Sequence, residues 1–212
     1  MRSVILGKTA ESVLKGFPLA KNELTKDINS AVRASKEIKF PLVLKIYSKQ
    51  IVHKSDIGGV KVIKDIEELK KEYIHLVNIA KKRKFKLSGI LLQEFVQGKE
   101  LIIGIKKDAT FNHVIMFGIG GIYTEILKDV SFRICPITEH DAEAMINELK
   151  TKQLLLGARG EKPVDLKLLK SILVKVSKLP DKYKAISELD INPFIINDRI
   201  GKIVDIRIVM EK

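Results

Sequence analysis

Acidic and amide side chains alternate with aliphatic ones near the end of the sequence, in the segment Glu188-Leu189-Asp190-Ile191-Asn192-Pro193. In a β-strand, this alternation places Glu188, Asp190 and Asn192 on one face and the aliphatic residues on the other. Oxygen-bearing side chains in such a row repel each other unless a cation gathers them. The segment therefore predicts a metal site, although an ordinary exposed strand would show the same pattern.

A return strand brings a further carboxylate to this segment. The turn Asn197-Asp198-Arg199-Ile200-Gly201 predicts a hairpin with strands at roughly 187–196 and 202–209. Asn192 lies seven residues before Arg199 (199 − 192) and Asp205 six residues after it (205 − 199). Asp205 should therefore lie opposite Asn192 within one residue of register. The pair would suit Mg²⁺, which prefers one or two protein carboxylates completed by phosphate oxygens and water.

Two features further upstream could bind phosphate. Lys45 lies in the apolar strand expected at 41–46, where a buried ammonium is costly unless it is paired. A phosphate could supply the opposite charge, but a lysine that reaches solvent from an edge strand is the alternative. Gly58 and Gly59 follow this strand and could expose backbone N–H groups that cradle phosphate.

His53 lies in the same loop, between the strands expected at 41–46 and 59–63. An imidazole that titrates near neutral pH can be unprotonated and can attack a phosphoryl group. A loop histidine is nevertheless most often only solvated, so the residue type alone leaves both interpretations open. The other three histidines have weaker contexts, and we expect structural or surface roles for them.

Two common nucleotide-binding motifs are absent. Gly7-Lys8-Thr9 resembles the end of a P-loop, but Arg2 occupies the position that requires the first glycine. In the run Gly118-Ile119-Gly120-Gly121, the later glycine of a dinucleotide fingerprint is replaced by Tyr123. The glycine-rich backbone could still lie close to a ligand.

The composition is that of a soluble globular protein. The 212 residues are 45% hydrophobic and 31% charged, which allows one large domain or two small lobes. No apolar run reaches the roughly 18 residues needed to span a membrane. The apolar stretch at the N-terminus is too short for a signal peptide, and Cys135 is the only cysteine. We therefore expect a cytoplasmic protein with no membrane partner.

A formal net charge of +13 points to anionic partners. The densest basic run, residues 81–86, ends an expected helix, where cations complement the helix dipole. No helix-turn-helix or zinc spacing is present, and aromatic residues make up only 6% of the chain. The charge therefore favours phosphorylated small molecules over nucleic acid.

Hydrophobic periodicity predicts interleaved helices and strands. We expect helical structure over 10–38, with breaks near Gly16 and Asp27, and an amphipathic helix over 65–82 that Asp65 caps. Strands are expected at 41–46, 59–63 and 89–96, and a hairpin at 100–106 and 113–117. Further helices are expected near 139–150 and 165–178, before the closing hairpin. Recurring hairpins make this an α+β arrangement, not a doubly wound parallel sheet.

The ordered set of motifs resembles the ATP-grasp fold, and within it the β subunits of ADP-forming acyl-CoA synthetases. The resemblance spans roughly residues 15–209. The motifs that carry it are Phe40–Lys45, His53–Val60, Gln93–Val96, Gly98–Leu101, Gly118–Ile122, Lys128–Arg133 and Glu188–Pro193. Succinyl-CoA synthetase β subunits are similar at a greater distance, because they share an acidic-Ile-Asn-Pro hairpin.

This resemblance implies two α+β lobes with a nucleotide between them. We expect residues 1–92 to form an N-terminal helical segment and a lid lobe, and residues 93–212 to form the C-terminal lobe with the metal-binding hairpin.

The resemblance also implies roles for individual residues. Lys45, Gly58, Gly59 and Arg133 would contact the nucleotide phosphates, and Glu100 would bond the ribose. Gln93, Glu94, Phe95 and Val96 would form a hinge that reads adenine through backbone groups. Asn192 and Asp205 would hold Mg²⁺, and His53 would carry a phosphoryl group on its way to ADP.

The implied reaction is acyl-CoA + ADP + phosphate = acid + CoA + ATP. Nothing in the sequence resembles the part of the family that binds CoA, so an α subunit is expected, in an α2β2 assembly. Three alternatives remain open. They are a succinyl-CoA synthetase-like β subunit, a nucleotide-sensing ATP-grasp module without phosphotransfer, and a nucleic-acid binder driven by charge.

Overall fold

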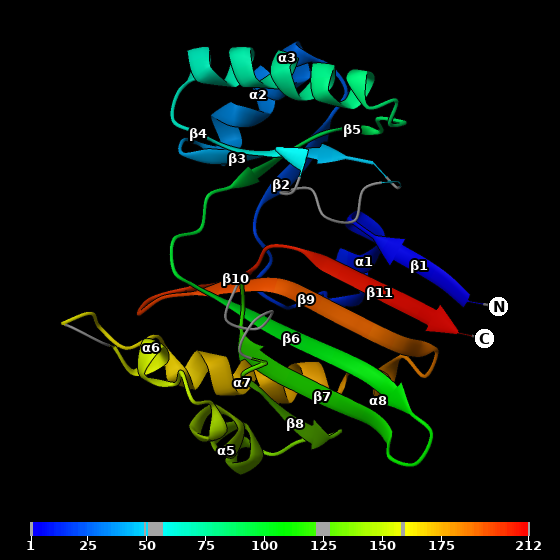
Figure 1. Ribbon diagram of the computed structural model, residues 1–212, viewed down its shortest axis with the longest axis vertical. Helices are drawn as coiled ribbons and strands as arrows, with labels where there is room; N and C mark the ends of the chain where they lie inside the picture. The colour runs from blue at the N-terminus through cyan, green and yellow to red at the C-terminus, as the bar shows by residue number, and fades with distance from the viewer. Residues whose placement is uncertain (1, 49, 51–56, 122–127, 158–159, 212) are drawn as a thin grey trace. The chain divides into compact units, whose positions relative to one another are not determined.

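The chain forms two compact units, which we describe separately. The computed structural model describes residues 2–48, 50, 57–121, 128–157 and 160–211. The smaller unit is the continuous segment Ala20–Val96, and the larger unit combines Met1–Leu19 with Gln97–Lys212. This division differs from the expected one at 92/93, because the first residues of the chain belong with the C-terminal ones. Their strand pairs with the last strand of the chain (Figure 1).

The smaller unit is a four-stranded antiparallel sheet with two helices on one face. Its elements are β2 (Asn22–Thr25), α2 (Ile28–Ile38), β3 (Leu42–Tyr47), β4 (Val60–Ile63), α3 (Ile66–Lys82) and β5 (Gly89–Glu94). The strand order is β2-β5-β3-β4. Buried aliphatic residues of β3 and β5 form one cluster with residues of α2 and α3, so the core lies between the sheet and its helices (Figure 1).

The larger unit is built on a seven-stranded sheet of order β1-β11-β9-β6-β7-β8, in which β10 also pairs with β9. Its strands are β1 (Arg2–Leu6), β6 (Lys99–Asp108), β7 (Asn112–Ile119), β8 (Val130–Ile134), β9 (Ile186–Ile196), β10 (Gly201–Ile203) and β11 (Ile206–Glu211). Its helices are α1 (Lys8–Val13), α5 (Glu139–Glu148), α6 (Gln153–Leu156), α7 (Leu166–Ser177) and α8 (Leu179–Lys182).

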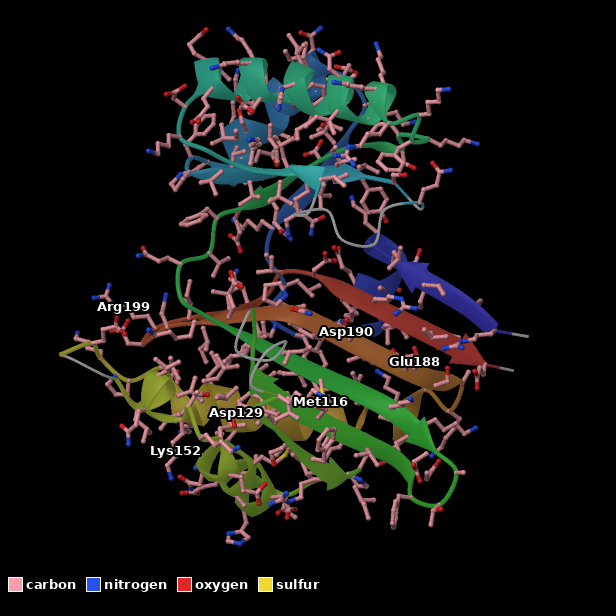
Figure 2. The ribbon with its side chains drawn as sticks, in the orientation of Figure 1. Met116, Asp129, Lys152, Glu188, Asp190 and Arg199 are labelled. Atoms are coloured by element: carbon pink, nitrogen blue, oxygen red, sulfur yellow. The ribbon has the colours of Figure 1, made fainter. Side chains whose placement is uncertain are left out.

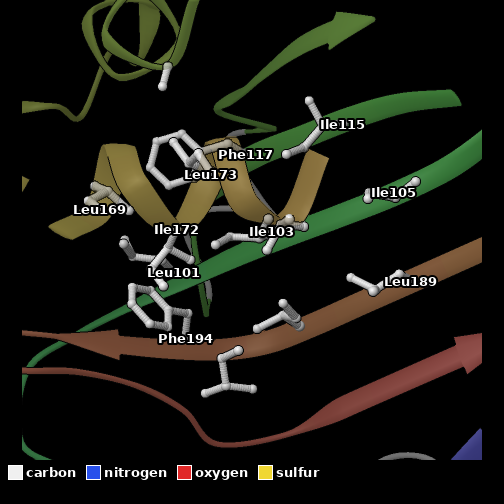
Figure 3. Packing of buried hydrophobic residues seen from close by; sticks show 14 of the residues in the cluster. Leu101, Ile103, Ile105, Ile115, Phe117, Leu169, Ile172, Leu173, Leu189 and Phe194 are labelled. Carbon is white, nitrogen blue, oxygen red and sulfur yellow. The ribbon is translucent and has the colours of Figure 1, made fainter. Parts of the chain in front are cut away.

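The core of the larger unit lies between the sheet and the helices α1, α5 and α7. Figure 3 shows Leu101, Ile103, Phe117 and Phe194 of the sheet facing residues of α7, among them Leu173. All five side chains are fully buried. We call the opposite side of this sheet its far face. Residues directly opposite each other in antiparallel strands share a face, so the core residues also identify the residues of the far face.

Most predicted elements are confirmed by the structure, with their local signals. Asp65 caps α3 by accepting a hydrogen bond from the Glu68 N–H at 2.8 Å. Thr138 and Asp141 form a reciprocal capping box at the start of α5. The fold class is confirmed as α+β with antiparallel sheets. The described residues contain no helix long and apolar enough to cross a membrane.

The expected helical structure over 10–38 is wrong for much of that range. Helix α1 ends at Val13, and the chain then passes through Gly16, whose φ is +91°, before it forms strand β2. The helix resumes only at Ile28, where Asp27 accepts the Ser30 N–H at 2.8 Å. Residues 22–25 form a strand because they pair with the buried strand β5. This tertiary contact outweighs local propensity. The strands β1, β2 and β8 were not predicted.

Candidate functional site

The alternation predicted for the acidic segment of β9 is confirmed. Leu189 and Ile191 belong to the core, with 2% and 0% of their surface exposed. Glu188, Asp190 and Asn192 therefore lie on the far face of the seven-stranded sheet. Figure 2 labels Glu188 and Asp190 on β9. An ordinary polar strand would also alternate, so the neighbours of each side chain decide what this face can do.

Asp205 lies opposite Asn192, as the register count predicts. The Asn192 N–H donates to the Asp205 carbonyl at 3.2 Å, and the next pair in the ladder is Ile206 with Ile191. One oxygen of the Asp205 carboxylate accepts the Ile206 N–H at 3.0 Å. An amide and a carboxylate thus stand side by side on neighbouring segments of one sheet.

Asp190 is half-buried between a glycine and an arginine. Its register partners are Gly104 on β6 and Arg207 on β11. Burial raises the pKa of the Asp190 carboxyl, and the nearby Asp205 carboxylate raises it further, whereas Arg207 lowers it. The two carboxylates are therefore close enough to repel each other, which is the condition that a bound cation relieves.

Glu188 has a different role from its neighbours on the far face. Its carboxylate pairs with the Arg2 guanidinium of β1 at 2.6 Å. Arg2 also lies 3.7 Å from Glu211. Glu188 thus helps to join the N-terminal strand to the sheet, and its carboxylate binds an arginine instead of a metal ion.

The donor set around Asn192 and Asp205 fits magnesium. Both residues offer side-chain oxygens, and one or two protein ligands suffice when phosphate oxygens and water complete the shell. No group of three or more Asp, Glu, His or Cys that could hold a metal occurs among the described residues.

In the smaller unit, Lys45 lies on an inner strand. Strand β3 is flanked by β5 and β4, so the alternative of a lysine reaching solvent from an edge strand is excluded. Leu44 and Ile46 point into the helix-covered core, so Lys45 lies on the opposite face of this sheet, with 8% of its surface exposed. Gln93 lies on the same face, because its partner Val43 is two residues from Lys45 on β3.

Two glycines of the predicted phosphate loop, Gly58 and Gly59, lie among the described residues. Gly58 has a φ of +69°, a conformation that favours glycine, and it is exposed. The Gly59 carbonyl accepts the Ile46 N–H at 2.9 Å, which fixes this turn to the strand that carries Lys45. His53 lies outside the described residues. His113 is buried, and its Nε2 is 2.8 Å from the Ile186 carbonyl, so its role is structural as expected.

The predicted adenine hinge coincides with the passage of the chain between the two units. The smaller unit ends at Val96 and the larger unit resumes at Gln97. The Glu94 N–H donates to the Lys21 carbonyl at 2.9 Å, and Phe95, 40% exposed, follows directly. Glu100 is exposed on β6, and its carbonyl accepts the Gly120 N–H at 2.7 Å, which ties the glycine-rich run to this strand.

A family model described as an ATP-grasp domain matches residues 1–210. The chain belongs to the ATP-grasp family. This finding confirms the resemblance to the ATP-grasp fold that was drawn from the ordered motifs. The narrower resemblance, to β subunits of ADP-forming acyl-CoA synthetases, is confirmed by similar proteins. The β subunit of ADP-forming acetate–CoA ligase II of Pyrococcus furiosus is 43% identical over 219 residues, which cover 99% of this chain and 93% of that subunit.

Longer relatives contain this ATP-grasp domain as one part. The ADP-forming 4-hydroxybutyrate–CoA ligase of Nitrosopumilus maritimus is 45% identical over 98% of this chain. The chain spans only 31% of that ligase.

Solved structures share the fold over nearly the whole chain. Acetyl-coenzyme A synthetase 1 of Ca. Korarchaeum cryptofilum, in complex with coenzyme A, Ca-AMPCP and HgCl+, gives a TM-score of 0.93 at 42% identity. The match covers 98% of this chain and 93% of the other. A form with coenzyme A and Mg-AMPPCP, whose phosphohistidine segment points towards the nucleotide-binding site, gives 0.85 at 40% identity with the same coverage.

In this ATP-grasp domain, Arg133 does not occupy the position that the resemblance implied. Its register partner Ile115 is a core residue, so Arg133 lies on the side of the sheet that α5 covers. Its guanidinium forms a bidentate pair with Glu148 of α5, in which one of the two contacts is 3.0 Å. It also donates to the Phe132 carbonyl at 2.7 Å. A contact with phosphate would have to break this pair, so we assign Arg133 a structural role.

Arg207 is a further candidate that the expected site residues did not include. It lies two residues after Asp205, which places it on the far face beside Asp190. The signal was available, because the alternation that selected Asp190 and Asn192 on β9 applies equally to the return strand.

Proposed function

We propose that this chain is the nucleotide-binding β subunit of an ADP-forming acyl-CoA synthetase. It transfers a phosphoryl group between a phosphohistidine and ADP in the reaction acyl-CoA + ADP + phosphate = acid + CoA + ATP. The observation that carries the proposal is the placement of Asn192 beside Asp205, joined by the backbone hydrogen bond of 3.2 Å. The 43% identity to a β subunit of this enzyme class over almost its full length supports the reaction type.

Within the larger unit, Asn192 and Asp205 hold Mg²⁺. When bound, this ion neutralises charge on the nucleotide phosphates, which is the main requirement of phosphoryl transfer. Glu100 bonds the ribose from its exposed position on β6. Asp190 lies next to these two residues, and we do not propose it as a metal ligand.

Within the smaller unit, Lys45 supplies a cation for the phosphates, and the backbone N–H groups of Gly58 and Gly59 bind the same anions. Such groups stabilise charge because they are fixed before the ligand arrives. The segment Gln93–Val96 presents backbone groups to the adenine. A hinge that reads the base through its backbone leaves side chains such as the exposed Phe95 free to vary.

His53 carries the phosphoryl group. Its unprotonated ring nitrogen forms the N–P bond as the bond to the phosphoryl donor breaks, and a terminal oxygen of ADP then displaces the histidine. A histidine relay serves a reaction whose acyl-phosphate and nucleotide sites are too far apart for direct transfer.

A partner subunit supplies the remaining chemistry. The relatives that this chain covers almost fully are named β subunits, and the longer ligases contain more than three times the matched length. We infer an α subunit that binds CoA and forms the acyl phosphate, in an α2β2 assembly. The cytoplasmic location stays a prediction.

Two variants test the proposal in the complex of this chain with its partner. One should lose activity but keep nucleotide binding, and the other should lose nucleotide binding. His53→Ala should abolish acyl-CoA-dependent ATP synthesis and leave Mg-ADP binding, measured by calorimetry, within about twofold.

Asp205→Ala should weaken Mg-dependent ADP binding by about tenfold or more, because charged ligands contribute on the order of 1.5–3 kcal/mol. Full activity of His53→Ala would instead favour a module that only senses nucleotide. Steeply salt-dependent DNA binding without nucleotide affinity would favour the nucleic-acid binder.

A further inference from the structure

The far face of the larger unit carries Arg207, which lies opposite Asp190 in the β-ladder. Among the described residues, neither a hydrogen bond nor an ion pair engages the Arg207 guanidinium, although the residue faces Asp190 in the β-ladder. Arg207 is exposed, and its partner on the other side is Leu6 of β1. A guanidinium in this situation is available to a ligand.

The position of Arg207 distinguishes it from Lys106 and Arg2, two other cations of this face. Arg207 is two residues from Asp205, which directly precedes β11, so the Cα atoms of the two residues are about 7 Å apart. Lys106 lies opposite Glu188, four residues along β9 from Asn192 and so about twice as far from the proposed metal ligands. Arg2 is already paired with Glu188 and Glu211.

Because Arg133 pairs with Glu148, the proposed function so far assigns no basic side chain of the larger unit to the nucleotide phosphates. Phosphoryl transfer spreads charge over the terminal phosphate, and a cation beside the metal stabilises it. A guanidinium suits this task because its planar fork donates two hydrogen bonds to neighbouring phosphate oxygens.

We propose that Arg207 binds the terminal phosphate of the nucleotide, beside the magnesium held by Asn192 and Asp205. The inference rests on the proposed function. The Asp190 carboxylate, directly across the ladder, attracts the guanidinium and keeps it over the sheet. Gly104, on the other side of Asp190, adds no side chain, and a Cβ there would lie 3.4 Å from the Met116 Cε. The Met116 side chain of β7 thus lies over Gly104.

The test compares ligands that differ in their phosphates. Calorimetry with Mg-ATP, Mg-ADP, AMP and adenosine is performed on the wild type, Arg207→Ala and Arg207→Lys. Arg207→Ala should weaken Mg-ATP and Mg-ADP by about ten- to a hundredfold, since hydrogen bonds to charged groups are worth roughly 1.5–3 kcal/mol. Adenosine should bind within about twofold of the wild type, and the lysine variant should recover part of the loss. Arg199→Ala is the matched control, because this arginine lies in the turn after β9 with its side chain 81% exposed.

A purely structural role for Arg207 predicts a different result. If Arg207 only neutralised the charge of the Asp190 carboxylate, its removal would weaken the binding of all four ligands by the same factor. Asp190→Asn in the Arg207→Ala background would then restore binding. Either outcome would overturn the inference. Unchanged Mg-ADP affinity in Arg207→Ala, with the wild type binding normally, would overturn the inference alone. A wild-type chain that binds no magnesium nucleotide would overturn the proposed function as well.

Discussion

The bidentate pair between Arg133 and Glu148 joins the edge strand β8 to helix α5. Glu148 also accepts the Ser131 hydroxyl at 2.5 Å, so one carboxylate binds two side chains of the same strand face. Arg133 lies on the face of the sheet that α5 covers, whereas Arg207 lies on the far face.

The Arg133–Glu148 pair makes a prediction about acid stability. The hydrogen bonds from Arg133 lower the pKa of Glu148 from 4.5 to about 2. Because the folded-state pKa is the lower one, the pair contributes its full stability above about pH 4.5 and loses it as the pH falls toward 2. Urea unfolding of Glu148→Gln should therefore show a shallower loss of unfolding free energy over this range than the wild type. The half-exposed position of Glu148 keeps the effect modest.

Glu143→Gln is the control for that measurement. Glu143 lies on the same helix and pairs with Lys170 at 3.3 Å, but it does not bind the sheet. Wild-type and Glu148→Gln curves that run parallel from pH 4.5 to 2 would contradict the assigned role.

At the scale of elements, Asp129 fixes the connection that follows α5. This buried carboxylate accepts the Lys150 N–H at 2.9 Å, the Thr151 N–H at 2.8 Å and the Thr151 hydroxyl. Burial would raise the pKa of the Asp129 carboxyl, but these hydrogen bonds outweigh burial and lower it. Asp129 precedes β8, so a single side chain connects the start of that strand to the start of α6. The Asp of the Lys128–Arg133 motif therefore has a structural function.

Removal of this anchor should be costly. Asp129→Ala leaves two backbone N–H groups of a half-buried turn without their acceptor, and we expect a loss of about 1–3 kcal/mol in the free energy of unfolding by urea. Asp108→Ala is the comparison, because Asp108 likewise accepts the N–H groups of Thr110 and Phe111 at 2.8 and 2.9 Å. That carboxylate is exposed, so water can replace it and the loss should be smaller. Equal losses in the two variants would argue against burial as the cause.

At the scale of the whole molecule, the first and last strands of the chain pair with each other at one edge of the larger unit's sheet. β1 pairs with β11 over five residues, from Arg2 with Glu211 to Leu6 with Arg207. The smaller unit is an insertion between Leu19 and Gln97 with its own buried cluster. Each unit thus has a separate core, and a change at the N-terminus should act on one of them.

Deletion of residues 1–6 tests this organisation. It removes the neighbour of β11 and the Arg2 partner of Glu188, so amide hydrogen exchange should accelerate in β11 and β9. The exchange of α3 and β5 in the smaller unit should stay within about twofold of the full chain. Equal acceleration in both units would show that they unfold as one.

The local signals in the sequence were sufficient for the closing hairpin. Period-two alternation placed Asp190 and Asn192 on one face, and a count from the turn brought Asp205 opposite Asn192. Both inferences depend only on strand geometry and turn length, which are local properties. The caps at Asp65 and Thr138 were predictable for the same reason, because a capping residue acts within one turn of its helix.

The tertiary structure alone decided the features that depend on distant partners. The five residues of β1 carry no strand signal of their own and become a strand because they pair with the edge of β11, at the other end of the chain. Arg133 matched a family motif, but Glu148, fifteen residues later (148 − 133) on another element, determines where its guanidinium points. Spacing along a chain fixes the face from which a side chain leaves its own strand. Only the packing of other elements determines what that side chain meets.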